Sequence, residues 1–278
     1  AGAVRSAYGR RQAAGSLPAA DNVPCCSKIM AGKKKSPSKP SSAVLTGRTE
    51  AVRVKTANKR SLASTLWLQR QLNDPYVAEA QKRGYRSRAA FKLLQLDEKF
   101  NLLGAGKRVV DLGAAPGGWT QVAVERVKPQ TGKGQVVGLD ILEMEDVPGA
   151  HTFQADFLDE TAPERLKALL GGPADVVLSD MAAPTTGHSP TDHLRIMNLA
   201  DAAYDFAEEV LGPGGAFVCK LFQGGAEKDL LNRLKRDFAV VRHAKPAASR
   251  ADSSETYVVA TGFRGEKRRA DGAGGEQA

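Results

Sequence analysis

The sequence predicts an α/β protein built on a doubly wound, mostly parallel sheet, and three observations support this prediction. A short apolar run at residues 108–112 leads directly into the glycine-rich string DLGAAPGGW, at Asp111–Trp119. Short apolar runs then alternate with amphipathic segments as far as Thr261, which is the cadence of βαβ units. Single aspartates follow several of these runs, where open α/β sheets bind their ligands. With 278 residues and 42% hydrophobic composition, the chain can bury such a core.

The expected elements follow from periodicity and from breaks in it. Residues 74–100 predict a short helix, a break at Gly84 and a second, amphipathic helix. The apolar face of that second helix contains Ala89, Leu93, Leu96 and Phe100. Seven strands are expected, at 108–112, 135–139, 151–154, 175–179, 216–221, 239–242 and 256–261. Further helices are expected at 120–127, 161–170, 192–211 and 227–238.

Positive charge is concentrated at the N-terminal end. Residues 1–60 contain 13 lysines and arginines against two acids, whereas the whole chain has a formal net charge of +9. We expect a disordered basic arm over 1–60, an α/β domain over 61–264 and a disordered tail over 265–278. A mobile cationic arm attracts polyanions such as RNA, although a plain solubilising tail is the alternative. Met30 is an alternative translation start.

The sequence lacks the signatures of membrane and secreted proteins. No apolar stretch approaches the roughly 18 residues of a membrane span, and no secretory signal is arranged in the chain, so a cytoplasmic protein is expected. Cys25 and Cys26 are adjacent and Cys219 stands in an expected strand, which provides neither a disulfide framework nor a C-x-x-C pair. The four histidines are scattered, so no metal site is expected.

The loop at Asp111–Trp119 is the strongest single indication of function. Its small residues allow a ligand to lie against bare backbone. The string fits the dinucleotide-binding turn only in part, because Ala115 stands where the G-x-G-x-x-G pattern needs a glycine to admit a pyrophosphate. The Pro-Gly-Gly turn suits a ligand without phosphates, and the string resembles motif I of S-adenosylmethionine-dependent methyltransferases. A turn that merely packs a helix on a strand is the alternative.

Charged side chains at the ends of the expected strands are candidate ligand and catalytic groups. Asp140 can accept hydrogen bonds from both ribose hydroxyls of an adenosine, and Asp156 from the adenine amino group, unless they are plain capping acids. Asp180, in LSDMAAP, is followed by no aromatic residue that could stack a flipped base, which argues against methylation of a base nitrogen. Lys220 stands in the apolar run AFVCKLF, where a charge is costly unless it serves a site.

A basic cluster marks the junction between the first two expected helices. It comprises Lys82, Arg83, Arg86 and Arg88, with Tyr85 among them. Cations with an aromatic ring are typical of surfaces that grip phosphates and stack a base, so these residues are candidate RNA contacts. The alternative is a solvated face of a surface helix.

Five segments together resemble the FtsJ/RrmJ family of ribose 2′-O-methyltransferases, over about residues 60–264: RSRAAFKL, DLGAAPGGW, LSDMAAP, VCKLFQGG and SSETYVVATGFR. The resemblance implies the Rossmann-like class I methyltransferase fold, with an antiparallel seventh strand, and S-adenosylmethionine as cofactor. It implies a catalytic tetrad of Lys92, Asp180, Lys220 and Glu255. The implied cofactor contacts are Gly117, Trp119, Asp140, Asp156 and Asp180. The implied substrate is a uridine ribose in large-subunit rRNA, within the assembled large ribosomal subunit.

The chemistry of a ribose hydroxyl suggests roles for the tetrad. The hydroxyl is a weak acid, so the enzyme must align it and take or share its proton. Lys220 is expected to deprotonate or orient the hydroxyl, Asp180 to hold Lys220 and the sulfonium side, and Lys92 with Glu255 to position the acceptor. Desolvation and a second cation favour loss of the Lys220 proton, whereas the two acids oppose it.

Other functions stay open at this point. Relatives with the same tetrad methylate tRNA or capped mRNA, and mitochondrial large-subunit rRNA is a further possible substrate. A non-catalytic RNA-binding assembly factor would keep the fold without the chemistry. An NAD-dependent oxidoreductase is disfavoured by Ala115. The protein is expected to act as a monomer, with RNA as its partner.

Overall fold

The computed structural model describes residues 52–184, 186–222, 227–251 and 253–265. Most of the expected basic arm and of the expected tail lies outside these ranges. The end of the expected arm lies inside them and contains a short 3₁₀ helix, η1 (Ala57–Lys59), and the buried side chain of Val54. The amide of Val52 donates to Oδ1 of Asn73 at 2.7 Å, so residues 52–60 are attached to the domain.

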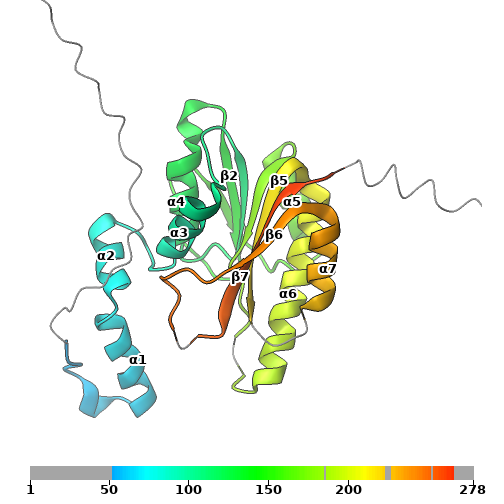
Figure 1. Cartoon of the computed structure of the whole chain (residues 1–278). Coiled ribbons are helices and arrows are strands. Elements are labelled where there is room, and N and C mark those ends of the chain that lie inside the picture. Colours follow the sequence, from blue (N-terminus) through cyan, green and yellow to red (C-terminus); the bar gives the residue numbers. More distant parts are fainter. Residues whose placement is uncertain (1–51, 185, 223–226, 252, 266–278) are drawn as a thin grey trace, which may run out of the picture. The chain divides into compact units, whose positions relative to one another are not determined.

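A seven-stranded sheet forms the centre of the domain, in the order β3-β2-β1-β4-β5-β7-β6 (Figure 1). Its strands are β1 (Arg108–Leu112), β2 (Gln135–Asp140), β3 (His151–Gln154), β4 (Ala174–Ser179), β5 (Leu211–Phe222), β6 (Phe238–Ala244) and β7 (Glu255–Phe263). Strands β1 to β5 pair in parallel, and β7 is antiparallel to both of its neighbours. The expected class I topology is therefore confirmed. The chain order reverses between β1 and β4, which opens a crevice at the carboxyl edge of the sheet.

Helices cover both faces of the sheet (Figure 1). One face packs against α2 (Pro75–Arg83), α3 (Ala90–Phe100) and α4 (Gly118–Val127). The other face packs against α5 (Thr161–Leu170), α6 (Ser189–Val210) and α7 (Lys228–Asp237). Helix α1 (Leu62–Leu72) precedes α2 and buries none of its side chains. No helix in the described ranges combines the length and the apolar character needed to cross a membrane.

Alternation along the central strands decides which side chains face which layer. In β5, Phe217, Cys219 and Leu221 join the core under α5, α6 and α7. Ala216 and Val218 join the core under α3 and α4, and Lys220 continues that second series. Because Lys220 pairs with Tyr257 in the antiparallel register of β5 and β7, the two side chains lie on the same face.

Several element boundaries differ from the expected ones, mostly by one or two residues. Helix α4 begins at Gly118 and α6 at Ser189, two and three residues before the expected starts. Strand β5 begins at Leu211, which the periodicity had placed in the preceding helix. Leu211 pairs with Ala174, and a register shift separates this pair from the rest of the ladder. Strand β5 therefore begins at Leu211, before the Gly-Pro-Gly-Gly segment. Helix α1 was not predicted, because its exposed leucines make no core-facing stripe.

Candidate active site

The loop between β1 and α4 approaches its neighbours so closely that it requires glycine. Gly113 has a φ of 82°, and a Cβ there would lie 2.8 Å from the backbone nitrogen of Met181. Gly117 has a φ of 109° and precedes α4, where a Cβ would lie 2.9 Å from Nη1 of Arg86. These positive φ values and short distances explain why the motif carries glycines at both positions.

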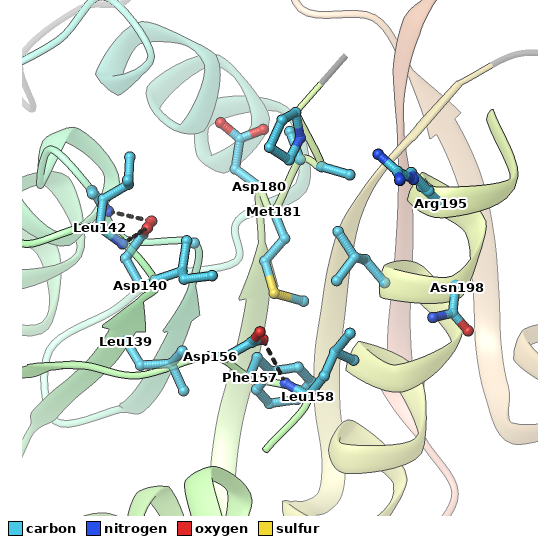
Figure 2. A pocket seen from close by; sticks show the side chains of 17 residues that line it. Leu139, Asp140, Leu142, Asp156, Phe157, Leu158, Asp180, Met181, Arg195 and Asn198 are labelled. Atoms are coloured by element: carbon cyan, nitrogen blue, oxygen red, sulfur yellow. Dashed lines mark hydrogen bonds between the residues drawn. The ribbon is translucent and has the colours of Figure 1, made fainter. Parts of the chain in front are cut away.

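A cavity of about 580 Å³ opens beyond the carboxyl ends of β1, β2 and β4 (Figure 2). Gly113 and Ala115 line it from the glycine-rich loop, and three aspartates line it from the strand ends: Asp140, Asp156 and Asp180. Helix α6 contributes Arg195 and Asn198, which Figure 2 shows on the far side of Met181 from Asp140. A cavity of this size can hold a nucleoside-sized ligand.

Asp140 and Asp156 are oriented by backbone amides. Asp140 accepts hydrogen bonds from the amides of Ala115 at 2.9 Å and Leu142 at 2.8 Å, one on each oxygen. Asp156 accepts one from the amide of Leu158 at 3.0 Å (Figure 2). Each carboxylate oxygen has a second lone pair, so both side chains retain acceptor capacity for a ligand in the cavity.

Asp111, in β1, is an acid to which no role was assigned from the sequence. It is fully buried; Oδ2 accepts a hydrogen bond from the Thr120 hydroxyl at 2.7 Å, and Oδ1 has no partner. Burial raises the pKa of Asp111 to about 7; the Thr120 bond opposes this, and the charges of Asp180 and Asp140 add to it. The structure thus has a poorly satisfied carboxyl group beside two of the acids that line the cavity.

The four residues expected as a catalytic tetrad form one connected group. Nζ of Lys92 lies 2.7 Å from Oε1 of Glu255, and Nζ of Lys220 lies 3.0 Å from Oδ1 of Asp180. Lys220 also donates to the backbone oxygen of Asp180 at 2.5 Å. Tyr257 joins the two ion pairs, because its hydroxyl donates to Oδ1 of Asp180 at 2.8 Å and accepts from Nζ of Lys92 at 3.2 Å.

Burial distinguishes these side chains from surface ion pairs. Their exposed fractions lie between 8% for Lys220 and 17% for Asp180, so each is largely desolvated yet close to solvent. Burial first, and then the charges of Asp180 and Glu255, raise the pKa of Tyr257 well above its ordinary value. Tyr257 is therefore a neutral hydrogen-bond donor at neutral pH.

Trp119 and Gly117 support the cavity from behind, and neither is among the residues that line it. The indole nitrogen of Trp119 donates to the backbone oxygen of Ala89 at 2.8 Å. The Trp119 ring lies 5.7 Å, centroid to centroid, from that of Tyr257. The side chain of Trp119 thus packs motif I against the helix that carries Lys92 and the strand that carries Glu255.

Most side chains of the expected basic RNA-binding cluster make hydrogen bonds or ion pairs within the protein. Tyr85 is buried, and its hydroxyl donates to Glu125 at 2.8 Å. The prediction that its ring could stack on a base is therefore wrong. Arg83 pairs with Glu79 at 2.6 Å. Arg86 donates to the backbone oxygens of Pro116, Glu145 and Asp146, and Arg88 donates to Asp74 and to the backbone oxygen of Ala248. Lys82, with 79% of its side chain exposed, is the member of the cluster most open to solvent.

Comparison with known proteins assigns the family. A family model described as FtsJ-like methyltransferase matches residues 85–263. The chain belongs to this family. It is 69% identical over 221 residues to "Ribosomal RNA large subunit methyltransferase E" of Paramagnetospirillum magneticum, a match that covers 78% of this chain and 90% of that protein. The protein of the same name from Rhodospirillum rubrum is 65% identical over 215 residues, with 77% and 82% covered.

A solved structure supports the same assignment of this FtsJ-like methyltransferase. A crystal structure from Plasmodium falciparum, assigned as a ribosomal RNA methyltransferase, is 31% identical, with a TM-score of 0.58. The match covers 65% of this chain and all of that one. The chain is thus an enzyme of the methyltransferase class, with the Rossmann-like fold of its family.

Several residues of the FtsJ-like site were not identified from the sequence. Tyr257 could have been found, because it stands two residues after Glu255 in an expected strand and so shares its face. Arg195 and Asn198 carry no motif and reach the cavity only because α6 crosses its rim. Across the described part of the chain, no group of three or more His, Cys, Asp or Glu side chains is arranged to hold a metal ion.

Proposed function

We propose that this FtsJ-like enzyme transfers a methyl group from S-adenosylmethionine to a ribose 2′-hydroxyl of large-subunit rRNA. The observation that carries the proposal is a buried network of side chains that runs from Lys220 through Asp180, Tyr257 and Lys92 to Glu255. Asp180 brings this network to the lining of the cavity. The names of the similar bacterial proteins support rRNA of the large subunit as the acceptor. A uridine and an assembled subunit are the finer parts of the proposal.

The cavity has the donor set that this cofactor would need. Asp140 would accept hydrogen bonds from the ribose hydroxyls of the adenosine and Asp156 from its amino group. Asp180, which lines the cavity together with Gly113, suits the cationic end of the cofactor. S-adenosylmethionine supplies, when bound, a methyl group on a positively charged sulfur.

The tetrad would handle the proton of the acceptor hydroxyl. The ion pair with Asp180 stabilises Lys220 as an ammonium ion, which can hold the 2′-oxygen by a hydrogen bond. Transfer of the ammonium proton to Asp180 would leave a neutral amine at Nζ, which could take the hydroxyl proton as the 2′-oxygen bonds to the methyl carbon. The bond between that carbon and the sulfonium sulfur would break in the same step, and S-adenosylhomocysteine would leave. Lys92 and Glu255 keep Tyr257 aimed at Asp180. Most of the rate enhancement is expected from alignment.

Methyl transfer from radiolabelled S-adenosylmethionine tests this proposal. The acceptors are isolated large subunits, naked large-subunit rRNA and bulk tRNA, each from a strain that lacks the enzyme so that the target ribose is unmodified. We expect label in the large subunit and resistance of the labelled nucleotide to alkaline cleavage, because a 2′-O-methyl group blocks that reaction. Label confined to tRNA would overturn the rRNA assignment, and label on a base would overturn ribose methylation.

The variant Lys220→Ala separates catalysis from binding. We expect kcat to fall by about 10² to 10⁴-fold while calorimetry shows an unchanged affinity for S-adenosylmethionine. Lys133, which is exposed and lies before β2 at the amino edge of the sheet, offers a matched control as Lys133→Ala. Full activity of Lys220→Ala would contradict the mechanism. A wild type without transferase activity would support an RNA-binding assembly factor instead.

We further propose that the enzyme is cytoplasmic and acts as a monomer.

A further inference from the structure

We propose that a phosphate subsite lies beside Lys92 and Glu255, where Arg70 and Arg250 hold a phosphodiester next to the ribose that is methylated. The inference deepens the proposed function and rests on it for the identity of the acceptor. The observation is a second cavity, of about 410 Å³, separate from the one that would hold the cofactor. Its lining includes Arg70, Arg88, Lys92, Arg250, Ser253 and Glu255.

The second cavity shares two residues with the tetrad. Lys92 and Glu255 line it, whereas Asp180 lines the first cavity, and Tyr257 connects the two pairs. A ligand in the second cavity therefore lies across the tetrad from the cofactor cavity. An acceptor whose hydroxyl reaches Lys220 from that side must pass close to Lys92.

The chemistry of RNA places a phosphate at that position. The carbon that bears the 2′-hydroxyl is bonded to the carbon that bears the 3′-phosphodiester, so any group that holds the hydroxyl has a phosphate beside it. Contacts to phosphates fix the register of a nucleic acid without reading its sequence. A positive pocket next to the reacting ribose would align the hydroxyl irrespective of the neighbouring bases.

The charge of the second cavity suits a phosphate. Among the residues that the structure describes, four cations line it, and Glu255, which pairs with Lys92, supplies the one carboxylate. Behind the cavity, Asp74 pairs with Arg88 and lies 3.7 Å from Nη2 of Arg250. Asp74 thus serves two guanidinium groups, so within the described ranges the charges of Arg88, Lys92 and Arg250 exceed those of Asp74 and Glu255. Guanidinium groups bind phosphate oxygens through two parallel hydrogen bonds.

The loop that carries Arg250 is fixed against the catalytic layer. The amide of Ala248 donates to Oε1 of Gln95 at 2.8 Å, and the backbone oxygen of Ala248 accepts from Arg88. The Ser249 hydroxyl donates to Oε1 of Glu255 at 2.9 Å. Arg250 itself keeps 34% of its side chain exposed, so a positively charged group reaches solvent from an anchored backbone. An anchored cation can orient a substrate at a low cost in conformational entropy.

The subsite is tested with Arg250→Ala and with Arg70→Ala. The matched control is Lys133→Ala, which also removes one exposed positive charge but lies before β2, at the amino edge of the sheet. We expect each arginine variant to raise KM for the rRNA substrate about tenfold or more, with kcat changed less than threefold and unchanged affinity for S-adenosylmethionine. Arg250→Lys retains the charge and should restore part of the loss.

A modified RNA locates the contact. The substrate is a short rRNA fragment in which a neutral methylphosphonate replaces the phosphodiester on the 3′ side of the labelled ribose. We expect this fragment to bind wild type and Arg250→Ala equally, whereas the unmodified fragment binds the variant more weakly. The salt dependence of binding should also fall, by about 0.7 in log Kd per log salt concentration for one lost contact.

These experiments distinguish failure of the phosphate subsite from failure of the proposed function. Equal RNA affinity and equal KM for Arg250→Ala, Arg70→Ala and Lys133→Ala would overturn the subsite while the proposed function stands. If wild type methylates no RNA, the proposed function fails, and the binding measurements with the two fragments still decide the subsite. An equal penalty for Arg250→Ala on both fragments would show that Arg250 acts elsewhere and would likewise overturn the subsite.

Discussion

The hydroxyl of Tyr257 donates a 2.8 Å hydrogen bond to Oδ1 of Asp180, and through this bond the two ion pairs of the site become one group. Nζ of Lys220 lies 3.0 Å from the same Oδ1, so the tyrosine and the lysine share one acceptor atom. The same hydroxyl accepts from Lys92. A neutral side chain thus links the ion pair of Lys92 and Glu255 to that of Lys220 and Asp180.

Removal of that hydroxyl should slow catalysis without affecting the cofactor. In Tyr257→Phe the ring stays against Trp119, but Asp180 loses one donor and Lys92 loses one acceptor. We expect kcat for methyl transfer to fall about tenfold, with an unchanged Kd for S-adenosylmethionine. Tyr85→Phe, which removes a hydroxyl bonded to Glu125 at 2.8 Å, is the control. Equal kcat values in the two variants would contradict a positioning role for Tyr257.

The glycine-rich loop should tolerate no side chain at Gly113. Gly113 and Gly132 have similar φ values, 82° and 77°, so alanine is strained at both positions by about 1 kcal/mol. At Gly113 the new Cβ would also lie 2.8 Å from the backbone of Met181, whereas at Gly132 nothing lies within 4 Å. Urea denaturation should show Gly113→Ala to be less stable than Gly132→Ala by about 1–3 kcal/mol. Equal stabilities would show that the backbone at Met181 moves freely.

Cofactor affinity should depend on Asp140. In Asp140→Ala, the ligand loses a charged acceptor and the amides of Ala115 and Leu142 lose their partner. We expect calorimetry to show a Kd for S-adenosylmethionine that is about 10 to 100 times higher. The exposed Glu143, three residues further along, provides the charge-matched control Glu143→Ala. A Kd within twofold of wild type for Asp140→Ala would rule out its contact with the ribose.

The buried carboxyl group of Asp111 should make stability depend on pH. Its pKa is about 7 in the folded protein against about 4 in an unfolded chain, so the folded state keeps its proton over this range. The free energy of unfolding of the wild type should therefore fall, relative to Asp111→Asn, as the pH rises from about 4 to about 7. Above pH 7 this fall in the free energy of unfolding, relative to Asp111→Asn, should be complete, at a total of up to about 4 kcal/mol. A difference that does not change with pH would contradict this assignment.

Much of the fold could be predicted because its signals are local. The apolar runs of the parallel strands and the periodicity of α3 and α5 are written in consecutive residues, and the structure has elements at these places. Helix α1 and the start of β5 were missed for the opposite reason. Leu62, Leu66 and Trp67 of α1 are exposed, so they form no buried stripe, and Leu211 joins β5 only through a pairing with Ala174.

The site divides in the same way. Lys92, Asp180, Lys220 and Glu255 could be named from short motifs, because family motifs preserve the reactive groups themselves. The availability of Tyr85 could not be judged, because only packing places its ring in the core between α2, α3 and α4. Arg86 belongs to a basic run in the sequence, yet its guanidinium group is directed at three backbone oxygens far along the chain.

The sequence by itself determined the order of the elements, the glycine-rich loop, the family and the residue types of the tetrad. These properties depend on neighbours in the chain or on motifs of a few residues. The tertiary structure decided which charges meet: Tyr257 between two ion pairs, Asp111 buried beside Asp140 and Asp180, and Arg250 beside Lys92. The reason is physical, since burial and charge pairing depend on distances in space that the spacing of residues along a chain does not define.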